Sequence, residues 1–323
     1  MTDPVPLPDG YKVGHWSAAD ARTGCTVVIP PAGTRGGVDV RGGGTGSREL
    51  EALSPLANAE GPTAVLLTGG SAFGLAAGDG VMHWLEERGL GRPTPAGIIP
   101  LVASAVVYDL AEGEPGTRPR LEEGYAACEA AAGGIPKRGA VGAGCGAAVG
   151  KLFGRERATP GGVGYASGVL AGGESIAAIA VANAFGDVIG QNGELLGAPR
   201  DEKGQLVRTA DLLPDMPELP ELPSGSVGSA GNTTLACVCT DASLDKRSCA
   251  IVARMASAGI ARAVNPAFTP IDGDVVFCLA SGSQPPATPG LPATWALAVL
   301  GALAATVTAA AIRDAVAPVV SHP

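Results

Sequence analysis

The sequence has little aromatic or charged character and very few histidines. Aromatic residues make up 4% of the 323 positions, charged residues make up 16%, and there are three histidines. A Ser-His-Asp triad needs a histidine beside its nucleophile. His15 lies in the N-terminal segment, His83 in a helix-like pattern and His322 in the C-terminal tail, and none is in a glycine-rich or strand-end context that would pair it with a nucleophile. Any catalytic base is therefore expected to be a group other than histidine.

Metal-binding and disulfide patterns are also missing. The seven cysteines are scattered without a C-x-x-C pair, and no cysteine and histidine cluster has the spacing of a zinc site. Cys237 and Cys239 are two residues apart in an apolar run, so a strand there would turn both side chains to one side of a sheet. We expect buried, reduced cysteines, typical of a reducing compartment, and no metal ion.

Nucleotide-binding signatures are absent from the two glycine-rich segments. Gly42–Gly46 does not read G-x-G-x-x-G at the start of a helix, and Gly142–Gly144 is not followed by a helix pattern. Lys151 follows a glycine but precedes Leu152, where a phosphate-binding loop needs Ser or Thr. We therefore expect no nucleotide and no other cofactor.

The balance of charge argues against a nucleic-acid partner. The formal net charge is −9, whereas nucleic-acid binding needs a basic stripe that follows the phosphates. The N-terminus has neither the basic nor the apolar region of a signal peptide, so we expect a cytoplasmic protein. Trp295 to Ile312 is uncharged and long enough to span a membrane, but its many alanines favour a core helix over a membrane span.

Strand-like and helix-like segments alternate loosely along the chain, which predicts layered α/β sheets with helices outside. No internal repeat is evident. Residues 198 to 231 lose periodicity and read as a linker. Expected strands are Thr26–Pro30, Thr63–Thr68, Ile98–Leu110, Ser175–Asn183, Val188–Gly190, Thr234–Thr240 and Val275–Ala280. Expected helices are one with Phe73, Ala77, Val81, Trp84 and Leu85 on its apolar face, then Leu121–Ala132, Leu244–Ala258 and roughly 293–316.

The run Gly231-Asn232-Thr233-Thr234 joins a small-residue segment to an apolar strand-like run. If the Asn232–Thr233 bond is cut, Thr233 becomes an N-terminal residue that carries a hydroxyl nucleophile and an α-amine base. The α-amine has a pKa near 7.7–8.0 when free, so part of it is neutral at pH 7–8. The alternative is an ordinary turn before a strand.

Four residues elsewhere in the chain are candidates to assist such a threonine. Asp272 and Asp274 precede an apolar strand and have carboxylates that can orient an amine and a hydroxyl. Lys151 follows a run of small residues and can tune the environment of the nucleophile. Asn183 ends a strand, and its side-chain amide can donate to an oxyanion. Each also has an ordinary interpretation: a solvent turn for the acids, a surface lysine, and a turn asparagine.

The same positions carry a resemblance to a known family. The chain resembles the P1 family (peptidase family S58) of self-processing N-terminal-nucleophile hydrolases, which includes the L-aminopeptidase/D-esterase, β-aminopeptidases, pantetheine hydrolase and the 6-aminohexanoate-oligomer (nylon oligomer) hydrolases. Each motif alone is weak, but they occur in the order of the family. The matching segments are Val38–Gly43, Leu67–Leu75, Val106–Asp109, Gly142–Gly146 with Lys151, Val181–Asn183, Gly231–Thr234 and Asp272–Asp274.

The resemblance implies a four-layer αββα sandwich of the N-terminal-nucleophile hydrolase type, shared with ornithine acetyltransferase. It implies one self-processing domain over residues 1–323, cut into an α chain of residues 1–232 and a β chain of residues 233–323. Thr233 would be the nucleophile, with Lys151 beside it, Asn183 in the oxyanion hole and the two aspartates orienting it. The αβ units would associate into a homo-oligomer, a tetramer by analogy.

One departure from the family bears on the substrate. The aminopeptidases of the family carry a glutamate before the segment that corresponds to Val107–Asp109, and it binds the free amino group of the substrate. Here the run Val102–Asp109 has no acid before Asp109, which is similar to the nylon-oligomer and pantetheine hydrolase branch. With Tyr108 at the substrate site, the resemblance implies hydrolysis of an internal amide in a small linear substrate. The alternatives are an aminopeptidase or D-esterase of the same family, and an uncleaved, non-enzymatic scaffold protein.

Overall fold

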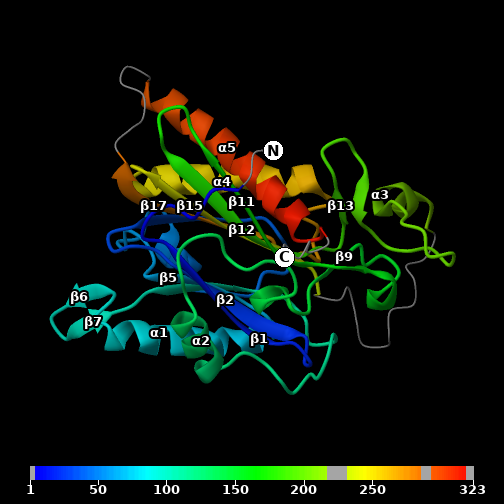
Figure 1. Cartoon of the computed structure of the whole chain (residues 1–323), viewed down its shortest axis with the longest axis horizontal. Helices are drawn as coiled ribbons and strands as arrows, with labels where there is room; N and C mark the ends of the chain where they lie inside the picture. Colours follow the sequence, from blue (N-terminus) through cyan, green and yellow to red (C-terminus); the bar gives the residue numbers. More distant parts are fainter. Residues whose placement is uncertain (1–3, 217–230, 285–291, 318–323) are drawn as a thin grey trace.

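Two five-stranded sheets lie face to face, and a pair of helices covers the outer face of each. The computed structural model describes residues 4–216, 231–284 and 292–317. In Figure 1 the helices α4 and α5 lie above the sheets and α1 and α2 lie below them. The layers follow the order helix, sheet, sheet, helix, so the expected αββα sandwich is confirmed.

The first sheet has the strand order β1-β2-β5-β8-β4 and is covered by α1 and α2. The second has the order β11-β12-β15-β17-β3 and is covered by α4 and α5. The first-sheet elements are β1 (Lys12–Ala18), β2 (Thr23–Ile29), β4 (Ser47–Arg48), β5 (Ala64–Thr68), β8 (Val102–Val106), α1 (Ala77–Glu87) and α2 (Leu121–Glu129). The second-sheet elements are β3 (Arg35–Val40), β11 (Gly162–Val169), β12 (Ser175–Asn183), β15 (Thr233–Ala242), β17 (Val275–Gln284), α4 (Lys246–Ala263) and α5 (Ala293–Asp314).

Several short strands and a short helix lie outside the two large sheets. In the described part of the chain, short strands form three smaller sheets, in which β9 pairs with β10, β6 with β7, and β13 with both β14 and β16. Their bounds are β6 (Arg92–Thr94), β7 (Gly97–Ile99), β9 (Ala148–Val149), β10 (Thr159–Pro160), β13 (Asp187–Ile189), β14 (Leu195–Gly197), β16 (Val264–Asn265) and the short helix α3 (Thr209–Leu212).

Both large sheets have the same pairing pattern. Across each sheet the neighbouring pairs run antiparallel, antiparallel, parallel and antiparallel. The parallel pair at the centre is β5 with β8 in one sheet and β15 with β17 in the other, and a helix, α1 or α4, joins its two strands. The topology is thus repeated even though the sequence shows no repeat.

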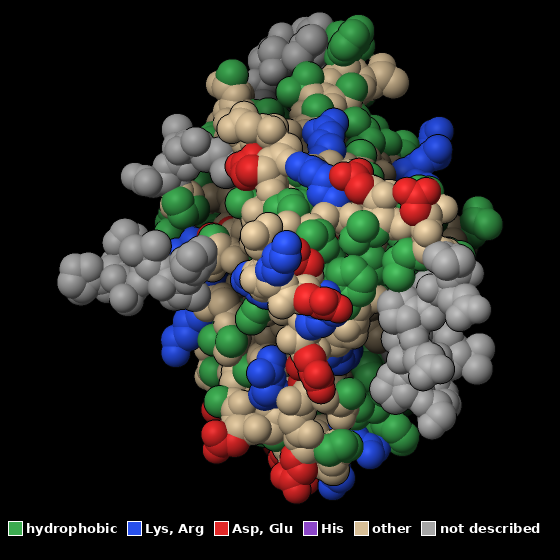
Figure 2. Space-filling model, turned by 90° about the vertical axis from the view of Figure 1, so that its right-hand side faces the viewer, with side chains coloured by type: hydrophobic (Ala, Val, Ile, Leu, Met, Phe, Trp, Pro, Cys, Tyr) green, Lys and Arg blue, Asp and Glu red, His purple; other side chains and the backbone are tan. Residues whose placement is uncertain are grey.

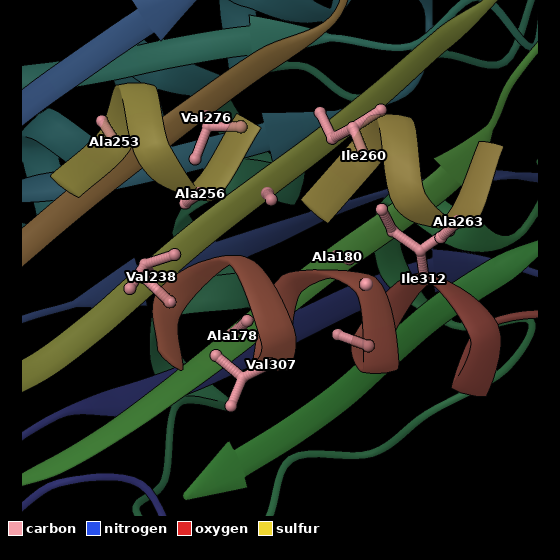
Figure 3. Packing of buried hydrophobic residues seen from close by; sticks show 14 of the residues in the cluster. Ala178, Ala180, Val238, Ala253, Ala256, Ile260, Ala263, Val276, Val307 and Ile312 are labelled. Atoms are coloured by element: carbon pink, nitrogen blue, oxygen red, sulfur yellow. The ribbon is translucent and has the colours of Figure 1, made fainter. Parts of the chain in front are cut away.

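Alternation along the central strands divides the interior into separate cores. On β12, Ala177, Ile179 and Val181 face the other sheet, while Ala178 and Ala180 face the helices. Figure 3 shows the helix-side core, where small strand residues allow close packing of the helices. At about 25 cal/mol per Å² of buried apolar surface, these continuous cores are the main stabilising contribution.

The cysteines follow the same alternation. Cys237 and Cys239 both lie in the core between the sheets, as their spacing predicted. All seven cysteines are buried and free.

The apolar helix near the C-terminus forms part of the sandwich. Of the described residues, only α5 is long and apolar enough to cross a membrane, with a mean hydropathy of 2.0. Its last three turns are buried against α4, β11 and β12. Gly259 on α4 allows this contact, because a Cβ there would lie 2.3 Å from the carbonyl oxygen of Ala305. The interpretation as a core helix therefore fits the packing.

Three sequence expectations about elements were wrong. The run expected as one strand from Ile98 to Leu110 is divided into β7 and β8, and Pro100, which has no N–H to donate to a ladder, lies between them. Phe73 is 59% exposed, because the chain forms a 3₁₀ helix at Ser71–Ala76 before α1 begins. The segment from 198 contains α3 and is not a structureless linker as far as residue 216, while residues 217–230 lie outside the described chain.

Charges of both signs are interspersed on the face of the molecule that Figure 2 shows. On that face, the described side chains do not form the single basic stripe that binding along a phosphate backbone requires.

Candidate active site

Two neighbouring strands bring the candidate nucleophile and an amide side chain together. Thr233 is the first residue of β15, and Asn183 is the last residue of β12. The antiparallel register places them directly opposite each other. Both are buried, Thr233 at 5% and Asn183 at 0% exposure. The sheet thus fixes the relative position of both side chains.

The Asn232–Thr233 peptide bond is held from both sides in the uncut chain. The hydroxyl of Thr233 donates to the carbonyl oxygen of Asn232 at 2.5 Å. The N–H of Gly273 donates to the same oxygen at 2.9 Å, and Asn232 pairs with Asp272 in a parallel β-bridge. The hydroxyl of the candidate nucleophile therefore lies against the carbonyl group of the preceding residue, and a backbone N–H donates to the same oxygen.

Lys151 is buried and is surrounded by hydrogen-bond acceptors. Its Nζ donates to the backbone and side-chain oxygens of Asn183, both at 2.8 Å, and to the carbonyl oxygen of Gly231 at 2.7 Å. Burial lowers the pKa of Lys151 to about 7, and the carboxylate of Asp272 partly opposes this effect. The lysine therefore lies between its charged and neutral forms at neutral pH.

Asn183 is oriented by its neighbours. Its Oδ1 accepts from Lys151 and from the N–H of Ala148 at 3.1 Å. Its Nδ2 donates to the carbonyl oxygen of Gly231 at 3.0 Å. The side-chain amide therefore donates to the carbonyl group that precedes Asn232, and the carbonyl oxygen of Asn232 itself accepts from Thr233 and Gly273.

The two aspartates hold the backbone around Thr233. Asp274 accepts from the N–H of Thr234 at 2.6 Å and from that of Phe268 at 3.1 Å. Asp272 accepts from Phe185 and Thr269. Burial, reinforced by the neighbouring Asp272, raises the pKa of Asp274 to about 7. The Asp274 carboxylate therefore holds the residue after Thr233, whereas Asp272 adjoins the residue before it through the backbone bridge to Asn232.

Two groups that sequence reasoning missed also belong to this site. One is the backbone N–H of Gly273, described above. The other is Arg155, whose Nη2 donates to the carbonyl oxygens of Tyr108 at 2.8 Å and Gly231 at 3.2 Å. Arg155 also forms an ion pair with Glu112. Its guanidinium carbon lies 5.6 Å from the ring centre of Tyr108, which places the expected substrate residue at the edge of the site.

Replacing Gly273 with alanine is expected to slow any cut at Thr233. A Cβ on Gly273 would lie 2.8 Å from Thr233 Oγ1 and 3.1 Å from the carbonyl oxygen of Gly44, so the hydroxyl must shift. A displacement near 1 Å costs about 10²-fold in rate. We expect a loss of that size in the rate at which two chains appear on a denaturing gel. Gly44→Ala is the matched control, because its Cβ would meet nothing closer than 3.6 Å. Equal rates in both variants would contradict this placement of the hydroxyl.

The whole chain matches a described protein family. The model of peptidase family S58 matches residues 8–320. An uncharacterized aminopeptidase of Mycobacterium tuberculosis (strain ATCC 25618 / H37Rv) is 40% identical, over 94% of this chain and 90% of its own length. The 6-aminohexanoate-oligomer endohydrolase of Paenarthrobacter ureafaciens is 30% identical, over 87% of this chain and 76% of its own length.

Solved structures show the same fold. A β-aminopeptidase of Burkholderia sp. aligns with a TM-score of 0.68 at 25% identity, over 96% of this chain and 84% of its own length. The L-aminopeptidase D-Ala-esterase/amidase of Ochrobactrum anthropi, described as a variant of the N-terminal-nucleophile hydrolase fold, aligns with a TM-score of 0.68 at 18% identity, over 95% and 84% of the two chains. The site of buried, hydrogen-bonded polar groups lies on this fold. Because the family model also matches residues 8–320, the chain belongs to peptidase family S58, a family of amide-bond hydrolases.

Proposed function

We propose that this protein is a self-cleaving amide hydrolase that uses Thr233 as an N-terminal nucleophile. The observation that carries the proposal is the contact of the Thr233 hydroxyl with the carbonyl oxygen of Asn232, 2.5 Å away, which also accepts the N–H of Gly273. The same carbonyl is thus approached by a hydroxyl and bound by a backbone N–H, the two groups that attack on a carbonyl requires.

The cut proceeds by an N-to-O acyl shift. The hydroxyl oxygen of Thr233 attacks the carbonyl carbon of Asn232, and the Gly273 N–H stabilises the oxyanion. Breaking the C–N bond leaves an ester between Asn232 and Thr233, and the hydroxyl proton passes to the released α-amine. Water then hydrolyses the ester, giving the carboxylate of Asn232 and restoring the hydroxyl of Thr233. The products are an α chain of residues 1–232 and a β chain of residues 233–323.

Substrate hydrolysis repeats this chemistry on another amide. The neutral α-amine of Thr233 accepts the proton of its own hydroxyl, which attacks the substrate carbonyl and forms an acyl-enzyme. The leaving amine takes the proton, and water releases the acid. Asp272 and Asp274 keep the segment around Thr233 in place, while Lys151 and Asn183 bind the acyl side. A role for Asn183 as an oxyanion donor in this step stays a prediction.

The substrates that fit best are internal amides of small linear oligoamides. A relative that is 30% identical is named a 6-aminohexanoate-oligomer endohydrolase, and no acid precedes Asp109 in the segment next to Tyr108. The second candidate is aminopeptidase activity, since relatives that are 40% identical are named uncharacterized aminopeptidases. Assembly of αβ units into tetramers and a cytoplasmic location stay predictions from the sequence.

A denaturing gel of the purified protein tests the proposal. We expect two bands in place of the intact chain of 31.7 kDa, and N-terminal sequencing of the smaller fragment should begin at Thr233. A single intact band that persists through prolonged incubation would overturn self-cleavage. A fragment that begins elsewhere in the chain would overturn the assignment of Thr233.

A further inference from the structure

Three hydrogen-bond donors converge on one carbonyl oxygen beside the bond to be cut. The oxygen belongs to Gly231, and the donors are Lys151 Nζ at 2.7 Å, Asn183 Nδ2 at 3.0 Å and Arg155 Nη2 at 3.2 Å. A backbone carbonyl needs only one or two donors to be satisfied. The third donor, from an arginine, therefore calls for an explanation beyond holding the precursor together.

These donors stay in place without Gly231. Arg155 is held by the carbonyl oxygen of Tyr108 and by Glu112. Lys151 keeps both oxygens of Asn183, and Asn183 keeps the N–H of Ala148. If the cut releases the end of the α chain, each donor retains its supports and has one N–H directed at the vacated position.

The chemistry of the cut shows what fills that position. The ester between Asn232 and Thr233 is itself an acyl-enzyme, in which the acyl group is the α chain. A substrate acyl group therefore takes the place of Asn232, and the group preceding it takes the place of Gly231. This step rests on the proposed function, because it requires that Thr233 be the nucleophile in both reactions.

We propose that Arg155 is a specificity-determining residue that, with Lys151 and Asn183, binds the carbonyl oxygen of the amide preceding the scissile bond. The substrates are accordingly N-acylated: the residue whose amide is cut carries an acyl group on its own nitrogen. A free-amine substrate leaves one N–H of each of the three donors without an acceptor and adds a cation beside Lys151 and Arg155. A site built to hydrogen-bond a substrate group strongly rejects analogues that lack the group.

Matched p-nitroanilides test the inference on the cleaved enzyme. In N-acetyl-alanine p-nitroanilide, the acetyl carbonyl corresponds to Gly231; alanine p-nitroanilide lacks it. We expect wild-type kcat/KM to be about 10²-fold higher for the acetylated substrate, as for the loss of bonds to buried polar groups. Arg155→Met should lower kcat/KM for the acetylated substrate about 10- to 100-fold and leave the free amine within about threefold.

Controls separate this inference from the proposed function. Arg157→Met removes a guanidinium from the same segment that lies over Phe153, outside the site, and should leave both substrates unchanged. Arg155→Lys keeps the positive charge but lacks the guanidinium whose Nη2 donates to both Tyr108 and Gly231, so it should resemble Arg155→Met. A wild-type preference for the free amine, or an equal fall on both substrates in Arg155→Met, would overturn the inference and leave self-cleavage standing. A wild-type chain that stays uncut would overturn both, since no position is then vacated.

Discussion

Thr233→Ala is expected to leave the chain as one intact band and to abolish amide hydrolysis. Alanine removes the hydroxyl that lies 2.5 Å from the carbonyl oxygen of Asn232, and with it the nucleophile of both reactions. Without the cut, no α-amine forms at position 233, so nucleophile and base are lost together. Loss of a catalytic nucleophile lowers kcat about 10⁶-fold in a well-studied hydrolase. We expect activity below detection, measured by gel and by anilide hydrolysis.

Two further variants make this test specific. Thr233→Ser keeps a hydroxyl and should retain part of both cleavage and hydrolysis, with a less fixed side chain because serine lacks the γ-methyl group. Thr306→Ala removes a hydroxyl from the exposed face of α5, where it donates to the carbonyl oxygen of Ala302 in the same helix, and should leave cleavage unchanged. A cut chain or residual turnover in Thr233→Ala would rule out this residue as the nucleophile.

Lys151→Met is expected to slow the cut about 10²-fold, the loss that a displacement near 1 Å from the reactive geometry causes. Methionine has nearly the same length but no donor for the carbonyl oxygens of Asn183 and Gly231, so the segment before the bond is no longer fixed. The rate at which the two chains appear after synthesis measures this directly. Lys203→Met, on an exposed turn, is the control. A rate within threefold of wild type would show that Lys151 does not position the bond.

The pKa of Lys151 adds a stability test of the same variant. Its value of about 7 in the folded chain lies below the ordinary 10.5, so between these pH values the unfolded chain binds more protons. The contribution of Lys151 to the free energy of unfolding therefore rises with pH from about 7 to 10.5, by at most about 1.4 kcal/mol per pH unit. In the uncut Thr233→Ala background, we expect Lys151→Met to lose this rise. Parallel stability curves for both chains over this range would contradict the buried lysine.

Asp274 should act in the opposite direction and in a different range. Its pKa of about 7 lies above the ordinary 3.8, so the folded chain binds more protons between these values and its contribution to stability falls as the pH rises. Near pH 7 the contributions of Lys151 and Asp274 to the free energy of unfolding are therefore both close to their lowest values. The site carries this cost at the pH at which an N-terminal amine begins to act as a base.

Most of the site residues could be found from the sequence because polar residues stand out among apolar strands. Asn183 and Thr233 each adjoin a continuous apolar run, and only tertiary pairing was needed to place them opposite each other. Gly273 could not be found in this way, because its contribution is a backbone N–H that any residue type has. Arg155 begins a short charged run with Glu156 and Arg157, which has no periodicity to single it out.

The resemblance to the family predicted the order of the layers. The hydrophobic pattern predicted the boundaries of individual helices and strands less well. The apolar run Ile98–Leu110 was expected as one strand, although Pro100, which has no N–H for a ladder, divides it into β7 and β8. Phe73 matched the spacing of a helix face, but the tighter turns of the 3₁₀ helix change which side chains point inward. These errors are local, since burial of whole faces determines the layers.

Strands β15 and β17 lie side by side at the centre of the second sheet, between β12 and β3. A cut before Thr233 would assign these two strands to the β chain and their outer neighbours to the α chain. Both strands of the β chain would then pair with strands of the α chain: β15 with β12 over eight residue pairs, and β17 with β3 over six. The mature protein would thus be two polypeptides that separate only when the second sheet unfolds, because neither chain would hold all five strands of that sheet.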